Sequence, residues 1–224
     1  SVDLIFGLPH EPLTRVQEEL EWLQKFQVTH LSAYLLTVEE KTPLLKQIEA
    51  QRKEAPDPDH QALVYETLQK EVAHLGFEQY EISSWAQPGH ESQHNRIYWS
   101  QGSYMGLGPG AHSCRLLPAG DMERRANRPH LKNWWDGTGD LEEIETLCPQ
   151  EAFLESVAFG LRDMKKGISL PNLAKRHQVD LPSKTSMGLV KMRDLGWLLL
   201  ERERWFLTPQ GALFADAVAR EILS

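Results

Sequence analysis

The sequence predicts a mixed α/β fold followed by a small winged-helix-like domain, and three observations support this. Two short apolar runs, Val2–Phe6 and His30–Leu36, flank a segment with helical spacing, as in a βαβ unit. Residues 149–223 combine short helical patterns with one strand-like pair. The charge balance also changes, from 13 basic and 23 acidic side chains over residues 1–145 to 11 and 9 over residues 146–224. We therefore expect two domains, one over residues 1–145 and one over residues 146–224.

The elements of the first domain follow from apolar periodicity and from turn residues. Val2–Phe6 is nearly all apolar, which is typical of a parallel sheet covered on both faces. Thr14 is the expected N-cap of a helix that runs to about Phe26. Gly76 is the expected C-cap of a helix over residues 59–75. The other expected elements are a short helix within residues 39–58, strands near 77–83 and 111–117, and a loop over 84–103.

The second domain is expected to combine helices with one hairpin. Pro149 suits the first position of a helix that extends to about Met164. The run LLLERERWFLT reads as two strands around a polar turn. Further helices are expected near residues 170–177, 184–195 and 209–223. This layout is typical of a winged-helix-like domain.

Composition excludes several classes of protein. The two cysteines, Cys114 and Cys148, form no CxxC pair, so a reducing compartment is expected, and the cytoplasm is the predicted location. A net charge of −8 argues against a nucleic-acid partner. No apolar run is long enough to span a membrane. Because the chain opens directly on an apolar strand, we expect that residues upstream are missing.

Candidate ligand-binding residues occur in and after the first two strands. Asp3 stands within an apolar strand, which is costly unless it is paired or binds a ligand; capping a neighbouring loop is the alternative. Gly7 lies beyond the end of that strand, and Thr37 ends the next one. In βα repeats, ligands bind at the carboxyl ends of the strands.

Residues 94–113, HNRIYWSQGSYMGLGPGAHS, are the most informative stretch of the chain. They combine histidines, large aromatics and closely spaced glycines, which suits a flat ligand against exposed backbone; a glycine-kinked strand with a loop is the alternative. His90 and His94 could bind zinc from a helix, but Pro88 and Gly89 argue against a helix here. His94 and Asn95 are therefore interpreted as residues that hold a ligand by polar contacts or that supply an axial ligand. The alternative is that His94 is a surface histidine without a binding role.

Five motifs in order resemble radical S-adenosylmethionine proteins related to oxygen-independent coproporphyrinogen III oxidase, and HNxxYW is most similar to the HemW-type heme chaperones of that group. The tail from Pro149, with its GLR and LTPQG elements, is similar to the C-terminal domain of the family. The motifs are DLIFGLP (Asp3–Pro9), HLSAYLLT (His30–Thr37), YEISSWA (Tyr80–Ala86), HNRIYW (His94–Trp99) and YMGLGPGAHS (Tyr104–Ser113).

The resemblance implies that residues 1–145 are the later part of a partial (β/α) radical S-adenosylmethionine barrel with a family-specific extension. The family also holds a [4Fe–4S] cluster on a CxxxCxxC loop, which this chain lacks, so the chain alone should be inactive and no catalytic residue is assigned. The implied S-adenosylmethionine contacts are Asp3, Gly7, Thr37 and His112, and the implied heme contacts are His94, Asn95, Tyr98 and Trp99.

Three functions remain open at this stage. The preferred one is a fragment of a heme chaperone that binds heme or a related porphyrin and passes it to a recipient protein. The alternative is an oxidase that decarboxylates coproporphyrinogen III by a radical route. A third is a DNA-binding regulator acting through the winged-helix-like tail, which the near-neutral charge of that tail disfavours.

Overall fold

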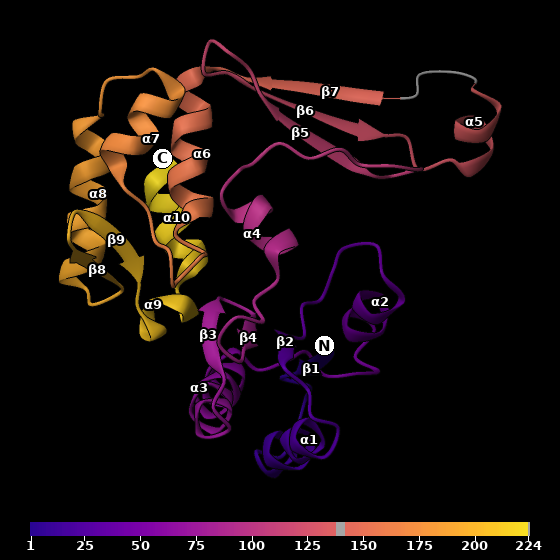
Figure 1. Ribbon diagram of the computed structural model, residues 1–224. Helices are drawn as coiled ribbons and strands as arrows, with labels where there is room; N and C mark the ends of the chain where they lie inside the picture. Colours follow the sequence, from indigo (N-terminus) through magenta and orange to yellow (C-terminus); the bar gives the residue numbers. More distant parts are fainter. Residues whose placement is uncertain (138–141, 224) are drawn as a thin grey trace. The chain divides into compact units, whose positions relative to one another are not determined.

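The computed structural model describes residues 1–137 and 142–223, which form two compact units, Ser1–Glu91 and Ser92–Ser224 (Figure 1). We call them unit 1 and unit 2. The mixed α/β class predicted from the sequence is confirmed. The domain boundary expected between residues 145 and 146 stays a prediction. In the part of the chain that the structure describes, no helix is long and apolar enough to cross a membrane.

Unit 1 is a four-stranded mixed sheet with helices. Its strands lie in the order β1-β2-β4-β3, with β1 and β2 parallel and the other two pairs antiparallel. The predicted βαβ unit is thus confirmed. The elements are β1 (Val2–Phe6), α1 (Thr14–Lys25), β2 (His30–Leu35), α2 (Pro43–Glu49), α3 (Pro58–His74), β3 (Glu78–Glu81) and β4 (Ser84–Ala86).

Three expectations for unit 1 were wrong in detail. Helix α1 begins at Thr14, and its N-cap is Leu13, without a side-chain hydrogen bond. The single strand expected over residues 77–83 is shorter, and a turn then leads into β4, inside the expected loop. Strand β1 is not covered on both faces, because Asp3 is exposed and Ile5 is 53% exposed, whereas β2 is buried on both faces from His30 to Ala33. The other face of β1 carries Phe6, which is fully buried.

The first part of unit 2 carries a three-stranded antiparallel sheet in the order β5-β6-β7. In Figure 1 this sheet extends away from the helices of unit 2, with α5 at its far end. Backbone hydrogen bonds between Tyr104 and Cys114 add the preceding segment to the outer side of β5. Of the helices and strands in this part of unit 2, only β5 was predicted from the sequence. The elements are α4 (Gln93–Trp99), β5 (His112–Leu116), β6 (Met122–Asn127), α5 (Leu131–Asp136) and β7 (Glu142–Leu147).

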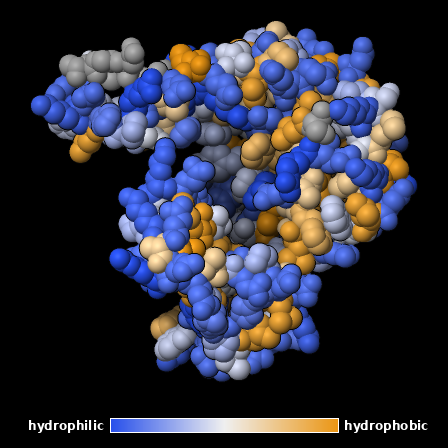
Figure 2. Space-filling model, turned by 180° about the vertical axis from the view of Figure 1, so that it is seen from behind, coloured by the Kyte–Doolittle hydropathy of each residue, from blue (hydrophilic) through white to orange (hydrophobic). Residues whose placement is uncertain are grey.

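The rest of unit 2 is helical with one hairpin, as predicted. The helix expected over residues 209–223 is interrupted at Phe214, and the helix that begins at Pro149 ends at Gly160. In Figure 2 the sheet of unit 2 is mostly hydrophilic on the face shown, whereas apolar patches are frequent over the helices. The elements are α6 (Pro149–Gly160), α7 (Leu170–His177), α8 (Ser183–Asp194), β8 (Leu198–Glu201), β9 (Arg204–Leu207), α9 (Pro209–Leu213) and α10 (Ala215–Leu223).

Candidate functional site

In unit 1, a glutamine holds the carboxyl ends of β1 and β2 together. The side-chain Nε2 of Gln61 on α3 donates to the carbonyls of Gly7, at 3.2 Å, and Leu36, at 2.9 Å. Gly7 has φ of +74°, and a Cβ there would lie 2.8 Å from Cγ of Gln61. The exposed Thr37 follows Leu36 directly. The structure therefore brings Gly7 and Thr37 to one edge of the sheet, and Gln61, which the sequence interpretation missed, fixes that edge.

Asp3 does not lie at this edge, and His112 belongs to unit 2. Asp3 is exposed within β1, opposite Ser32 of β2, and does not follow the strand as Gly7 does. His112 is the exposed first residue of β5, in unit 2. Of the four expected S-adenosylmethionine contacts, Gly7 and Thr37 share one sheet edge, and all four stay predictions.

In unit 2, His94 lies on a short helix rather than in the loop expected over residues 84–103. The hydroxyl of Ser92 caps this helix by accepting from the backbone N–H of Asn95 at 3.2 Å. Pro88 and Gly89, which argued against a helix, precede this cap and leave α4 intact. His90 lies outside α4, so it shares no helical face with His94.

An aromatic row runs from His94 to the sheet of unit 2. Nε2 of the exposed His94 lies 2.6 Å from the Tyr98 hydroxyl, and the two rings meet edge-on with centroids 4.7 Å apart. The ring of Tyr98 meets that of Tyr104 in the same way, again at 4.7 Å. The Tyr98 ring therefore fixes one side of the imidazole, and Tyr104 links this helix to β5.

Trp99 packs against other residues than His94 and Tyr98 do. Its ring stacks on Phe159 of α6 at 6.5 Å, and the Arg162 guanidinium lies 4.5 Å from its centroid. Its indole Nε1 is buried and has no hydrogen-bond partner among the described residues. Of the four predicted heme contacts, the structure thus joins His94 with Tyr98, places Asn95 at the helix start and packs Trp99 against α6.

The glycine-rich segment lies against its own strand. A Cβ on Gly106 would lie 2.2 Å from the carbonyl oxygen of His112, so no other residue fits there. The Gly106 N–H donates to the Ser113 hydroxyl at 2.9 Å, and the Asn127 side chain donates to the Gly108 carbonyl at 2.8 Å. The glycine at 106 therefore packs closely against the backbone of β5.

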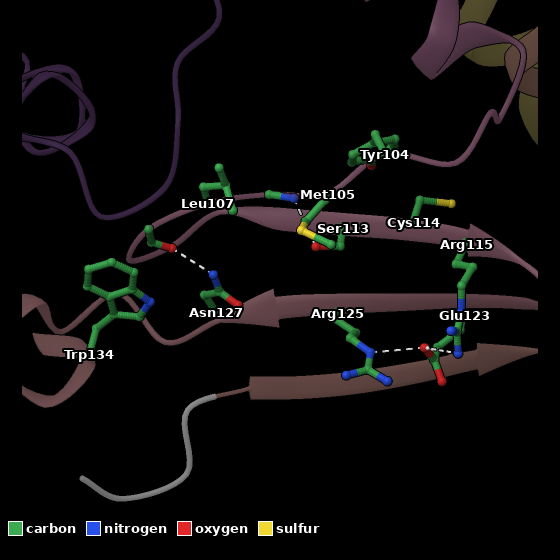
Figure 3. Close-up of a pocket in the computed structure, with 12 residues that line it drawn as sticks. Tyr104, Met105, Leu107, Ser113, Cys114, Arg115, Glu123, Arg125, Asn127 and Trp134 are labelled. Atoms are coloured by element: carbon green, nitrogen blue, oxygen red, sulfur yellow. Dashed lines mark hydrogen bonds and ion pairs between the residues drawn. The ribbon is translucent and has the colours of Figure 1, made fainter. Parts of the chain in front are cut away.

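Beside this segment lies a hollow of about 460 Å³ on the face of the sheet (Figure 3). Apolar side chains stand at one part of it, and two arginines with a glutamate stand at another. Sequence interpretation missed these arginines, because charged strand residues usually mark a solvated face. The lining residues are Tyr104, Met105, Gly106, Leu107, Gly108, Ser113, Cys114, Arg115, Glu123, Arg125, Asn127 and Trp134.

The cysteines of this chain do not fit an iron–sulfur cluster. Cys114 is buried, and burial raises the pKa of its thiol, which disfavours the thiolate that binds iron. Cys148 is exposed, at the start of α6. Residues 1–137 and 142–223 contain no group of three or more His, Cys, Asp or Glu side chains that could hold a metal ion. The chain therefore cannot supply the cluster ligands by itself.

Comparison with known proteins is consistent with the motifs. The HemN C-terminal domain family matches residues 147–214. A protein named heme chaperone HemW, from Mycobacterium tuberculosis, is 30% identical over all of this chain and 55% of its own length. Mouse radical S-adenosyl methionine domain-containing protein 1, mitochondrial, is 42% identical over 72% of this chain and 38% of its own length.

One solved structure shows the same fold at low sequence identity. Coproporphyrinogen III oxidase (HemN) from Escherichia coli, titled a radical SAM enzyme, is 16% identical, with a TM-score of 0.72 over 99% of this chain and 54% of that one. The chain spans about half the length of the curated relatives that it matches across its whole length. The predicted resemblance is thereby confirmed.

Proposed function

We propose that this chain, which is similar to the C-terminal part of heme chaperones of the radical S-adenosylmethionine group, binds heme through α4 for delivery to a recipient protein. The observation that carries this proposal is the exposed imidazole of His94, held edge-on by the Tyr98 ring. Neutral imidazole is a good ligand for iron.

The surroundings of His94 suit a site that binds heme and passes it on to another protein. Among the described residues, Tyr98 is the only hydrogen-bond partner of the imidazole, and it contacts Nε2 alone. Nδ1 can therefore ligate iron directly, or Nε2 can do so if the Tyr98 hydroxyl turns away. Because the ring is exposed, a bound heme stays accessible to a second protein. An exposed site of this kind favours handing heme on over retaining it in a closed pocket.

S-adenosylmethionine binding belongs to the same proposal, for which the resemblance assigns Asp3, Gly7 and Thr37 in unit 1 and, separately, His112 in unit 2. The edge that Gln61 fixes carries the exposed Thr37, whose hydroxyl a nucleoside or an amino acid could contact. When bound, this cofactor and a [4Fe–4S] cluster would supply radical chemistry, for which the cluster ligands must come from outside this chain. Location in the cytoplasm stays a prediction, since the mouse relative is named as mitochondrial.

Decarboxylation of coproporphyrinogen III is the second candidate, favoured by the fold shared with the Escherichia coli enzyme. The two candidates differ in what this chain can do unaided. A chaperone function requires heme binding by the residues of α4, which the chain contains. The oxidase function requires a cluster that its cysteines do not fit.

The test is a hemin titration of His94→Ala, followed by the Soret band. We expect the dissociation constant to rise at least about tenfold, equivalent to ~1.4 kcal/mol, because the iron loses a ligand. His90→Ala is the matched control, as it removes a second exposed histidine outside α4. An unchanged titration for His94→Ala, or an equal loss for His90→Ala, would contradict the proposal.

A further inference from the structure

A second hollow of unit 2, of about 230 Å³, is lined by residues of α4, α6, α7 and β9 and of the loop that follows α6. Three of its lining residues are cations, namely Lys166 of that loop, Arg176 of α7 and Arg204 of β9. Because they come from three separate segments, it is the fold that gathers these positive charges around one small space. Like charges repel each other, and an anion bound between them relieves that repulsion.

Within residues 1–137 and 142–223, none of the three cations forms an ion pair. Arg176 donates to the backbone carbonyl of Ser100 at 2.6 Å and to that of Gln101. Arg204 donates to two carbonyls of the loop after α6, each at 2.9 Å. The ammonium of the exposed Lys166 contacts no acceptor in the described part of the chain. Backbone carbonyls therefore hold the two guanidinium groups in place but do not neutralise them.

The acidic residue that lines this hollow, Asp163, does not compensate the three charges. Its Oδ2 lies 3.3 Å from Nε of Arg96, and its Oδ1 accepts from the backbone N–H of Lys166 at 2.9 Å. Arg96 is a further cation, so this buried pair adds no net charge. Burial lowers the pKa of the Arg176 guanidinium, as expected for a cation without a carboxylate partner.

The remaining donors in the hollow suit an anion with several oxygens. A guanidinium has five N–H donors, and each of the two arginines uses two of them on carbonyls. The polar residues Ser169 and Asn172 line the same hollow. A single guanidinium can satisfy a planar carboxylate, whereas a phosphate monoester carries up to about two negative charges and three acceptor oxygens. Three cations from different directions therefore match a phosphate better than a carboxylate.

We propose that this hollow binds the phosphate group of a small ligand, with Lys166, Arg176 and Arg204 as the cations that contact it. Its volume is below the roughly 300–1,000 Å³ of pockets that hold drug-sized molecules, so the ligand is small. This inference does not rest on the proposed function, because a phosphate brings no iron and His94 does not line the hollow.

The test is isothermal titration calorimetry of the full chain with inorganic phosphate at constant ionic strength. Lys166→Gln is the variant of choice, since the ammonium that it removes makes no contact in the described part of the fold. We expect its affinity for phosphate to fall about fivefold, because one charge-assisted contact is lost. Lys175→Gln is the matched control, as it removes the same charge from an exposed residue of α7 that does not line the hollow.

A second variant separates loss of the site from loss of the fold. Asn172→Asp places a carboxylate beside the three cations, so we expect it to bind no phosphate detectably. Asn172 lies in the first turn of α7, where an acidic side chain is favourable to a helix. The urea midpoint of this variant should therefore be at least that of the wild type.

Acetate is the comparison ligand, and we expect it to bind the wild type at least about tenfold more weakly than phosphate. Equal affinities for the two anions would mean that the hollow does not select phosphate. The proposal is also overturned if the wild type binds no phosphate, or if Lys175→Gln weakens binding as much as Lys166→Gln does. Phosphate binding by a folded Asn172→Asp variant would place the anion elsewhere.

Discussion

Helix α4 and the junction between α7 and the β5–β6 turn each hold a histidine whose Nε2 contacts a hydroxyl, yet they differ in accessibility. In α4, His94 is exposed and lies 2.6 Å from the Tyr98 hydroxyl. At the junction, His177 is fully buried, with its Nε2 2.8 Å from the Ser156 hydroxyl. Its Nδ1 donates to the Gly120 carbonyl at 2.9 Å. Because both ring nitrogens of His177 make hydrogen bonds within the fold, this residue stabilises the structure. His94 is exposed and can bind a ligand.

The largest expected difference between the two histidines is in their contribution to the free energy of unfolding. We expect His177→Ala to lower the free energy of unfolding by about 3 kcal/mol, because it leaves a cavity and two buried polar groups without partners. His94→Ala should change it by no more than about 0.5 kcal/mol, as is usual for a surface position. Urea unfolding followed by tryptophan fluorescence measures both values. Similar losses for the two variants would remove the distinction between the regions.

A second prediction compares two glycines with nearly the same backbone conformation. Gly120, in the turn at the junction, has φ of +93°, and a Cβ there would lie 2.3 Å from the His177 carbonyl oxygen. Gly108 has φ of +99°, and a Cβ there would have no atom within 4 Å. Since backbone strain is common to both, Gly120→Ala should be more destabilising than Gly108→Ala by about 2 kcal/mol, the cost of the clash. Urea midpoints give this difference, and equal midpoints would mean that the turn moves freely away from α7.

The sequence predicted those elements whose apolar pattern is strong. Val2–Phe6 and His30–Leu35 are short apolar runs around an amphipathic helix, and they form the parallel pair as expected. Strand β6, MERRAN, has no such pattern, because its core-facing row includes Arg124. That side chain pairs with Glu155 of α6 and with Glu145, so a charged residue occupies a position where an apolar one signals a strand. Salt bridges made across the fold have no local signature.

The candidate site was predicted in part for a similar reason. The motif containing His94 and Tyr98 has a distinctive amino-acid sequence, and the structure places these two residues in contact. Gln61 and His177 act on backbone carbonyls of Leu36 and Gly120, respectively, and any residue can supply a carbonyl. Their partners are therefore invisible in the sequence. Only the folded chain shows which polar residues fix the backbone and which remain open to a ligand.

The smallest expected effect in this comparison is on the pH dependence of stability. Burial lowers the pKa of His177, aided by the nearby Arg176 and opposed in part by the bond to Gly120. The folded state therefore binds a proton less readily than the unfolded chain. The stabilisation is complete above the unfolded pKa of about 6.5 and is lost as the pH falls towards the lower folded value.

His177→Asn should accordingly flatten the decline in stability below about pH 6.5. His30 in unit 1 also has a pKa lowered by burial, so some decline should remain in this variant and disappear when His30→Asn is added. The measurement is the urea midpoint at a series of pH values from about 5 to 8, the range in which a histidine titrates. A decline in His177→Asn as steep as that of the wild type would show that this junction tolerates a charged imidazole. It would then resemble the α4 region, in which solvent reaches the ring.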